Sequence, residues 1–279
     1  MITRWELLKN CERRLSAAGV DSPSLSAEVL LMHVLNIDRL ELMLDRFVAV
    51  LAEDHDKFIE LVKRREYGEP VAYLIGHREF YGREFLVSPD VLIPRPETEQ
   101  IIDVIVDDYP RDKLLNIVDV GSGSGILAIT LAVMYPNAKV IGVDVSRAAL
   151  RIAQQNAFKH RVDARIVFVC ASLLSSIKMN DADLIVANLP YVPRIFEPSM
   201  DCEVVNFEPH MALFGGYDGL DLYRELFKMI GQMRSGSRML CECDSSHASQ
   251  LEAMGQEKGW SAFVRKDLSG RDRLVDVVF

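Results

Sequence analysis

The sequence predicts an α/β protein whose mostly parallel sheet carries helices on both faces. From residue 114 onward, short apolar runs alternate with amphipathic stretches, and this alternation is typical of strand–helix–strand units. A turn with three glycines joins the first apolar run to the first of these helices. The preceding part differs, because residues 1–74 show helical spacing only. We therefore expect two unequal domains joined by a short connector.

Composition and charge are those of an ordinary soluble globular protein. Of the 279 residues, 49% are hydrophobic and 26% are charged, and no apolar run is long enough to span a membrane. The N-terminus has no signal-peptide pattern and the five cysteines are scattered, so we expect reduced thiols and a cytoplasmic location. The formal net charge of -9 argues against direct binding of a long nucleic-acid backbone. The His and Cys residues do not cluster in the sequence, so no metal site is predicted.

Residues 1–74 are expected to form a small N-terminal helical domain. Apolar residues recur at helical spacing in four stretches. The helices are expected over residues 5–15, 27–35, 39–44 and 53–66. A bundle of this size has little core of its own, so it should lean on the rest of the chain or on a partner.

Residues 75–95 are expected to connect the two domains. Residues 80–87 are predicted to form a β-hairpin with Gly82 near its turn. Two prolines fix the backbone that follows. The second of them, Pro96, suits the first turn of a helix that continues through Ile105.

Residues 96–279 are expected to form the α/β domain. Apolar runs predict five strands and a terminal pair of strands. The strands are expected over residues 114–120, 139–143, 165–170, 183–187 and 238–243, and the pair over 262–266 and 273–279. Helices are expected from the glycine turn to Leu131, and over residues 146–159, 217–233 and 246–258.

The first strand ends in a glycine-rich loop that can hold a nucleotide-like cofactor. The loop Gly121-Ser122-Gly123-Ser124-Gly125 allows a ligand to approach backbone N–H groups closely. The dinucleotide pattern Gly-x-Gly-x-x-Gly would require its third glycine where Ile126 stands. Asp144 ends the second strand, where a carboxylate can accept both hydroxyls of a ribose. The loop and this acid fit either NAD or S-adenosylmethionine.

The fourth strand ends in a second candidate site, Asn188-Leu189-Pro190-Tyr191. Ligands of open α/β sheets bind at the carboxyl ends of the strands. The Asn188 side chain and the Leu189 backbone each offer a carbonyl oxygen, and Tyr191 offers a flat aromatic face. Together they can hold a planar group that carries an NH2 at its edge. Taken alone, the four residues fit an ordinary strand-to-loop turn equally well.

The loop, Asp144 and the Asn-x-Pro-Tyr motif together resemble the class I S-adenosylmethionine methyltransferases that act on planar NH2 groups. Nearly the whole chain is similar to one branch, the protein-glutamine N5-methyltransferases of peptide-chain release factors (the PrmC/HemK family). The stretches that carry this resemblance are Arg64-Arg65, Glu69-Pro70-Val71-Ala72-Tyr73-Leu74-Ile75-Gly76, Phe80-Tyr81-Gly82, Val91-Leu92-Ile93-Pro94-Arg95-Pro96-Glu97-Thr98-Glu99, Phe207-Glu208-Pro209, Ala212-Leu213, Gly215-Gly216-Tyr217-Asp218-Gly219-Leu220, Tyr223-Arg224, Asp267-Leu268-Ser269-Gly270 and Arg273.

The resemblance implies a fold, a reaction and residue roles. It implies a Rossmann-like class I methyltransferase domain with a seven-stranded sheet, and an N-terminal domain that recognises the protein substrate. A methyl group would pass from S-adenosylmethionine, leaving S-adenosylhomocysteine, to the glutamine N5 in the Gly-Gly-Gln motif of release factors, which modulates translation termination. Asn188, Leu189, Pro190 and Tyr191 would bind the substrate and serve catalysis. The cofactor would contact the glycine loop, Asp144, Leu173 and Asn188.

Two positions depart from the family pattern. Leu189 stands where the family usually has proline, so Asn188 lacks the restraint that a following proline imposes. Ser172-Leu173 stands where an Asp and a bulky residue often lie near the adenine, which leaves Leu173 to pack on the ring. Asn-Leu-Pro-Tyr also resembles the adenine-N6 rRNA methyltransferases.

Three alternatives therefore stay open. One is an adenine-N6 nucleic-acid methyltransferase. Another is a ribosomal-protein glutamine methyltransferase, which shares Asn-x-Pro-Tyr but usually differs over the segment that reads Pro96-Glu97-Thr98-Glu99 here. The third is a non-catalytic module that binds S-adenosylmethionine or a nucleotide.

Overall fold

A computed structural model describes residues 2–178, 181–231 and 233–279. The chain divides into two compact units. The helical unit extends to His77 and also contains Asp201–Phe207, whereas the sheet unit consists of Arg78–Met200 and Glu208–Phe279. The three-part division expected from the sequence stays a prediction.

The helical unit is a set of amphipathic helices around a small apolar core. The core gathers leucines, such as Leu7, Leu15 and Leu30, around the fully buried Phe58. The first helix begins with a capping box, in which the Thr3 N–H donates to the Glu6 carboxylate at 2.9 Å. The four expected helices are confirmed. The helices are α1 Arg4–Ala17, α2 Pro23–Leu35, α3 Arg39–Leu44, α4 Ala52–Glu66, α5 Val71–Ile75 and α9 Cys202–Phe207.

A segment from much later in the chain completes the helical unit. Helix α9 belongs to it although more than a hundred residues separate α9 from the other helices of the unit. The Arg65 side chain, only 5% exposed, donates to Glu203 of α9 at 2.5 Å and to the Glu69 carbonyl at 3.0 Å. A buried, paired arginine is costly to disrupt. The helical unit therefore includes a segment from the later part of the chain, and the expectation that the bundle leans on the rest of the chain or on a partner stays a prediction.

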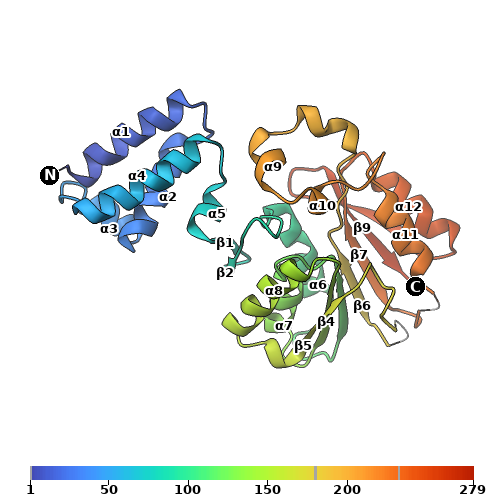
Figure 1. The fold of residues 1–279 in the computed structure, drawn as a ribbon. Coiled ribbons are helices and arrows are strands. Elements are labelled where there is room, and N and C mark those ends of the chain that lie inside the picture. The colour runs from blue at the N-terminus through green and yellow to red at the C-terminus, as the bar shows by residue number, and fades with distance from the viewer. Residues whose placement is uncertain (1, 179–180, 232) are drawn as a thin grey trace. The chain divides into compact units, whose positions relative to one another are not determined.

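The sheet unit contains the predicted seven-stranded sheet. Its strand order is β5-β4-β3-β6-β7-β9-β8, and pairing is parallel from β5 to β7 and antiparallel from β7 to β8 (Figure 1). The strands are β3 Asn116–Val120, β4 Lys139–Asp144, β5 Ile166–Cys170, β6 Leu184–Ala187, β7 Arg238–Glu242, β8 Ser261–Lys266 and β9 Asp272–Val278. The expected hairpin is also present as β1 His77–Phe80 and β2 Arg83–Leu86, with Tyr81 and Gly82 at its turn.

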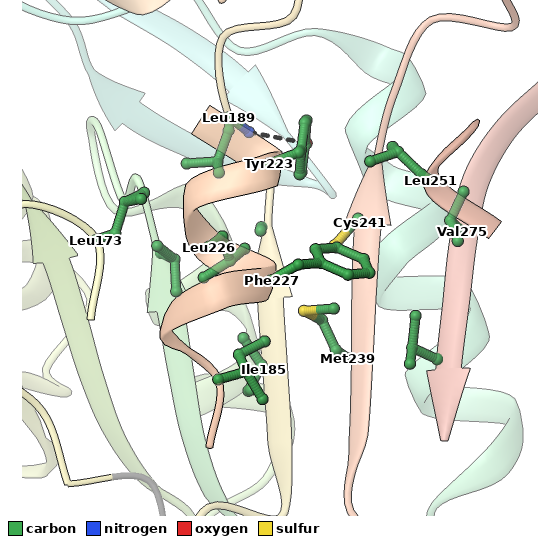
Figure 2. Packing of buried hydrophobic residues seen from close by; sticks show 14 of the residues in the cluster. Leu173, Ile185, Leu189, Tyr223, Leu226, Phe227, Met239, Cys241, Leu251 and Val275 are labelled. Carbon is green, nitrogen blue, oxygen red and sulfur yellow. Dashed lines mark hydrogen bonds between the residues drawn. The ribbon is translucent and has the colours of Figure 1, made fainter. Parts of the chain in front are cut away.

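Helices cover both faces of this sheet, as predicted. On one face, α6 Glu99–Asp108, α7 Ile126–Met134 and α8 Arg147–Lys159 contribute to one apolar core (Figure 1). On the other face, α11 Asp221–Met229 and α12 Ala248–Glu257 enclose a second core, with Phe227 of α11 lying against Met239 and Cys241 of β7 (Figure 2). Within the described part of the chain, no helix has both the length and the apolar character that a membrane span requires.

The helix expected over residues 217–233 is much shorter than predicted. Among the described residues of this range, only Asp221–Met229 is helical, because the residues before it form a turn around glycines with left-handed backbone angles. Gly219 has φ +84°, and a Cβ there would lie 2.2 Å from the Tyr191 carbonyl oxygen. The turn therefore has to pack directly on the backbone of the candidate motif, which a helix could not do.

Candidate active site

The two candidate sites lie at one edge of the sheet. In the strand registers, Val120 of β3 pairs with Val143 of β4 and with Ala187 of β6. The residues that follow these three positions therefore emerge side by side. Strand order also reverses here, because β3 is flanked by β4 on one side and by β6 on the other. In open α/β sheets, such a switch point is where ligands bind.

A cavity of about 510 Å³ opens at this edge. It is lined by four residues of the glycine loop, by Asp144 and by Asn188. The complete set of predicted site residues in the lining is Gly121, Ser122, Gly123, Ser124, Asp144, Leu173, Asn188, Leu189 and Pro190. Of the predicted residues, all of which fall in the described part of the chain, Gly125 and Tyr191 are not in the lining.

The glycine loop has one part that lines the cavity and another that packs against neighbouring helices. Gly121, with φ +78°, leaves no room for a side chain, since a Cβ there would lie 2.9 Å from Leu189 Cδ2. Gly125, with φ +83°, lies behind the loop, where a Cβ would meet Ile129 Cδ1 at 2.8 Å and Ala153 Cβ at 3.2 Å. The first glycine thus joins the loop to the Asn188-Leu189 segment. The last one lets α7 start close to α8.

Asp144 is held by backbone donors and faces the cavity. Its Oδ2 accepts the Gly123 N–H at 2.9 Å and its Oδ1 accepts the Ser146 N–H at 2.8 Å. Burial raises the pKa of Asp144, while these N–H groups and that of Val145 lower it. Each carboxylate oxygen can accept a further hydrogen bond, so the group suits a pair of ligand hydroxyls.

Asp119 was not among the predicted site residues, although it also lines the cavity. It is the penultimate residue of β3, one residue before Val120 and the loop, and it is 1% exposed. Its Oδ2 accepts the Ala128 N–H at 3.2 Å, and burial raises the pKa of Asp119 to about 7. An acid among the apolar residues at the end of a strand, two residues before a glycine turn, is the sequence signal that could have identified it.

The Asn188 side chain is restrained by a residue distant in sequence. Its Nδ2 donates to the Thr98 hydroxyl oxygen at 2.9 Å, and Thr98 is fully buried at the start of α6. The amide nitrogen is thereby engaged, and Oδ1 remains available to a ligand in the cavity. We expected Asn188 to be less fixed because Leu189 replaces a proline. Thr98 supplies a restraint that the motif itself does not.

Leu189 is held through its backbone. Its N–H donates to the Tyr223 hydroxyl at 3.2 Å (Figure 2), and that hydroxyl in turn donates to the carbonyl oxygen of Glu242. Burial raises the pKa of Tyr223 well above its usual value, so the hydroxyl keeps its proton. A proline at 189 would have no N–H to donate. The Leu189-Tyr223 bond is therefore a feature that depends on the departure from the family pattern.

Tyr191 points its hydroxyl at a buried acid, Glu242, at 3.3 Å from Oε1. Burial raises the pKa of Glu242 to about 7, although the Thr98 hydroxyl, the Arg273 charge and the Tyr191 hydroxyl lower it. Glu242 was not predicted as a site residue. The sequence signal is an acid between Cys241 and Cys243 in a strand that is apolar apart from Arg238 at its start.

Further parts of the cavity wall come from the segment before α6 and from the residues after β5. Glu208, buried at the end of the α9 region, accepts the Ile93 N–H at 3.1 Å and pairs with Arg95 at 2.5 Å. Arg95 lines the cavity, as do Ser172 and Leu173. Leu173 has φ +47°, a left-handed conformation that a branched side chain rarely adopts. These contacts give Glu208 a structural part in shaping the cavity.

Comparisons with known proteins agree with this architecture. Residues 6–76 match a PrmC N-terminal domain and residues 111–263 match a methyltransferase domain. The release factor glutamine methyltransferase of Koribacter versatilis (strain Ellin345) is 42% identical over 94% of this chain and 94% of its own length. The enzyme of the same name from Nitratidesulfovibrio vulgaris is 36% identical over 96% of this chain and 92% of its own length.

A solved structure shares the fold alone. The hMettl16 catalytic domain, in complex with a MAT2A 3'UTR hairpin, has a TM-score of 0.56 and covers 82% of each chain at 13% identity. Such low identity carries no statement about substrate. The two curated relatives, in contrast, match the chain from end to end at identities above 30%. The chain belongs to the family of release factor glutamine methyltransferases.

Proposed function

We propose that the protein transfers a methyl group from S-adenosylmethionine to the side-chain nitrogen of the glutamine in the Gly-Gly-Gln motif of peptide-chain release factors. The observation that carries the proposal is the position of Asn188. Its side chain lines the same cavity as the glycine loop, and its Nδ2 is bound to Thr98. The free Oδ1 is the acceptor that an amide NH2 requires.

The residues of the cavity suit S-adenosylmethionine. Asp144 has acceptor capacity for the ribose hydroxyls, and the glycine loop exposes backbone to the cavity. Ala171, Ser172 and Leu173 line the cavity next to the end of β5, and the apolar side chains of Ala171 and Leu173 suit packing against an adenine ring. When bound, this cofactor supplies an electrophilic methyl group to the substrate nitrogen, which loses one proton to solvent.

The chain's own residues act by orienting the substrate amide. An amide nitrogen is a poor nucleophile because its lone pair is shared with the carbonyl group. The NH2 group donates to Asn188 Oδ1 and to the Leu189 carbonyl oxygen, which turns its nitrogen towards the methyl group. Both acceptors also stabilise positive charge that develops on the nitrogen. Placement of this kind supplies roughly 7–11 kcal/mol at best.

Pro190 and Tyr191 complete the substrate side. Pro190 lines the cavity, and its carbonyl backs onto Gly215, where a Cβ would lie 2.3 Å away. Tyr191 lies outside the lining and its hydroxyl is bound to Glu242, so its proposed part is to support the motif. In this proposal, the N-terminal helical domain expected over residues 1–74 recognises the release factor. The protein then acts in the cytoplasm, where its substrate is.

One experiment separates this function from its alternatives. The protein is incubated with S-adenosylmethionine labelled on its methyl group, together with a release factor, ribosomal protein and RNA. We expect label on the release factor only, and no label when the glutamine of its Gly-Gly-Gln motif is replaced by alanine. Label on RNA would instead indicate an adenine-N6 nucleic-acid methyltransferase. Label on ribosomal protein would indicate a ribosomal-protein glutamine methyltransferase.

A further inference from the structure

A row of side chains, the buried Glu242 and Thr98 followed by Asn188, leads to the substrate half of the cavity. It begins at Glu242, which is 2% exposed and ends β7. One carboxylate oxygen accepts the Tyr191 hydroxyl, and the other, Oε2, has no hydrogen-bond partner among the described residues. The Thr98 hydroxyl lies beside this carboxyl and is the strongest of the neighbours that lower its pKa. Thr98 also receives the Asn188 amide bond.

The chemistry of these groups fixes the direction of the hydrogen bonds. An ionised carboxylate can only accept, so a Thr98 hydroxyl that faces it turns its proton towards Glu242. The oxygen of Thr98 is then an acceptor, and it must face the Asn188 NH2 rather than the Asn188 carbonyl oxygen. The reversed amide would place two acceptors against each other. The side-chain amide of Asn188 is therefore turned so that Oδ1 faces the cavity.

We infer that Thr98 and Glu242 are positioning residues, which select the Asn188 amide orientation that accepts the substrate NH2. The inference rests on the proposed function, because it concerns the same substrate nitrogen. Thr98 lines the cavity, but its hydroxyl oxygen is bound to the Asn188 amide, and Glu242 is not in the lining, so both act through Asn188. The arrangement also replaces the restraint that a proline at 189 would impose.

Protonation of Glu242 would exchange donors and acceptors along the hydrogen bonds from Glu242 through Thr98 to Asn188. A carboxylic acid can donate to Thr98, whose hydroxyl can then donate to Asn188 Oδ1 and turn the NH2 group into the cavity. The charged and titratable groups that act on Glu242 are Arg273 of β9, Glu97 before α6, and Tyr191. Activity should thus fall as the pH drops through the pKa of Glu242, about 7.

The test is a set of threonine variants with a matched control. Thr98→Val keeps the shape and removes the hydroxyl, and Thr98→Ser keeps the hydroxyl. Thr130→Val is the control, because Thr130 is also fully buried in the sheet unit but its Oγ1 has no partner within the described residues. We expect Thr98→Val to lower kcat/KM by about 10- to 100-fold, the range for outer partners of a positioned ligand. Thr98→Ser should restore most of the activity, and Thr130→Val should leave it unchanged.

Three further readouts separate positioning from folding. Cofactor Kd, measured by calorimetry, should stay within about twofold for Thr98→Val, since Asp144 and the loop are untouched. Adding Thr98→Val to Asn188→Ala should cause no further loss, because Thr98 acts only through Asn188. Glu242→Gln should lower activity and flatten the decline of activity below pH 7.

Each outcome decides the inference. Full activity of Thr98→Val, or additive losses in the double variant, would overturn it while leaving the proposed function intact. Wild-type protein that labels no release factor would remove the proposed function itself, and the inference with it. A weakened cofactor Kd in Thr98→Val would assign Thr98 to the cofactor pocket and also overturn the inference.

Discussion

The two halves of the cavity are built in different ways. The cofactor half is made of backbone, because its glycines have left-handed angles and its N–H groups bind Asp144. The glycine loop and Asp144 lie within about 25 residues of one another in the sequence. The substrate half is made of side chains from several elements, since Asn188, Thr98, Tyr223 and Glu242 come from β6, α6, α11 and β7 or their ends. One half depends on local chain geometry and the other on long-range packing.

This difference determines how each half tolerates substitution. A side chain at Gly121 would need space that Leu189 occupies, so the loop sequence is strictly limited. The motif at 188–191 accepts leucine in place of proline, because hydrogen bonds to Thr98 and Tyr223 hold its backbone and its side chain. Variants on the two halves should therefore separate transfer from cofactor binding.

The largest effect is expected for Asn188→Ala. Loss of the side-chain acceptor should lower kcat by roughly 10²–10³, by analogy with the removal of one oxyanion-hole donor. Cofactor Kd should change little, because Asp144 and the loop keep their bonds. Initial rates with labelled cofactor and release factor measure the first quantity, and calorimetry the second. Asn137→Ala, at an exposed asparagine of the same unit, is the control. Normal turnover by Asn188→Ala would refute the assignment.

The same difference explains how far the sequence could be interpreted. The loop, Asp144 and Asn188 were found because each directly follows an apolar run, and strand ends of a parallel sheet meet at one edge. Thr98, Tyr223 and Glu242 were missed as site residues. Each reaches the site only after α6, α11 and β7 have packed. The isolated acid Glu242 between two cysteines is a sequence signal, but nothing near Thr98 or Tyr223 in sequence indicates a ligand. The packing of Gly219 on Tyr191 was missed for the same reason, and a helix was expected there instead.

The next effect concerns stability and comes from Glu242. Its pKa is about 7 in the folded protein, against 4.5 for an ordinary glutamate. A raised carboxyl pKa favours folding below pH 4.5, and that contribution is lost as the pH rises through 7. The loss amounts to at most about 3 kcal/mol for this shift. Relative to wild type, Glu242→Gln should gain unfolding free energy as the pH rises from 5 to 8, measured by urea denaturation. If the difference in unfolding free energy between the two proteins stays constant from pH 5 to 8, Glu242 does not titrate with a raised pKa in the folded protein.

A smaller effect is expected on the cofactor half. Asp144→Asn removes the charge and one acceptor, and a hydrogen bond to a charged group contributes about 1.5–3 kcal/mol. Cofactor Kd should rise by about 10- to 100-fold, while kcat at saturating cofactor stays close to wild type. This pattern is the opposite of that for Asn188→Ala. The exposed Asp163, replaced by asparagine, is the matched control. A lower kcat with unchanged Kd would contradict the division between the two halves.

The smallest effect is expected for Tyr223→Phe, which tests whether hydrogen bonds replace the missing proline. The phenol accepts the Leu189 N–H and donates to the Glu242 carbonyl, and its removal leaves both buried groups without this partner. Such a loss costs about 1–3 kcal/mol of stability. Tyr135→Phe is the matched control, because the fully buried Tyr135 hydroxyl donates to the carbonyls of Ile105 and Tyr109, away from the cavity. Both variants should melt at lower temperature, but only Tyr223→Phe should also slow transfer, by a few-fold. Equal kinetics in the two variants would mean that packing against Gly121, rather than the Tyr223 hydroxyl, keeps the Leu189 carbonyl in place.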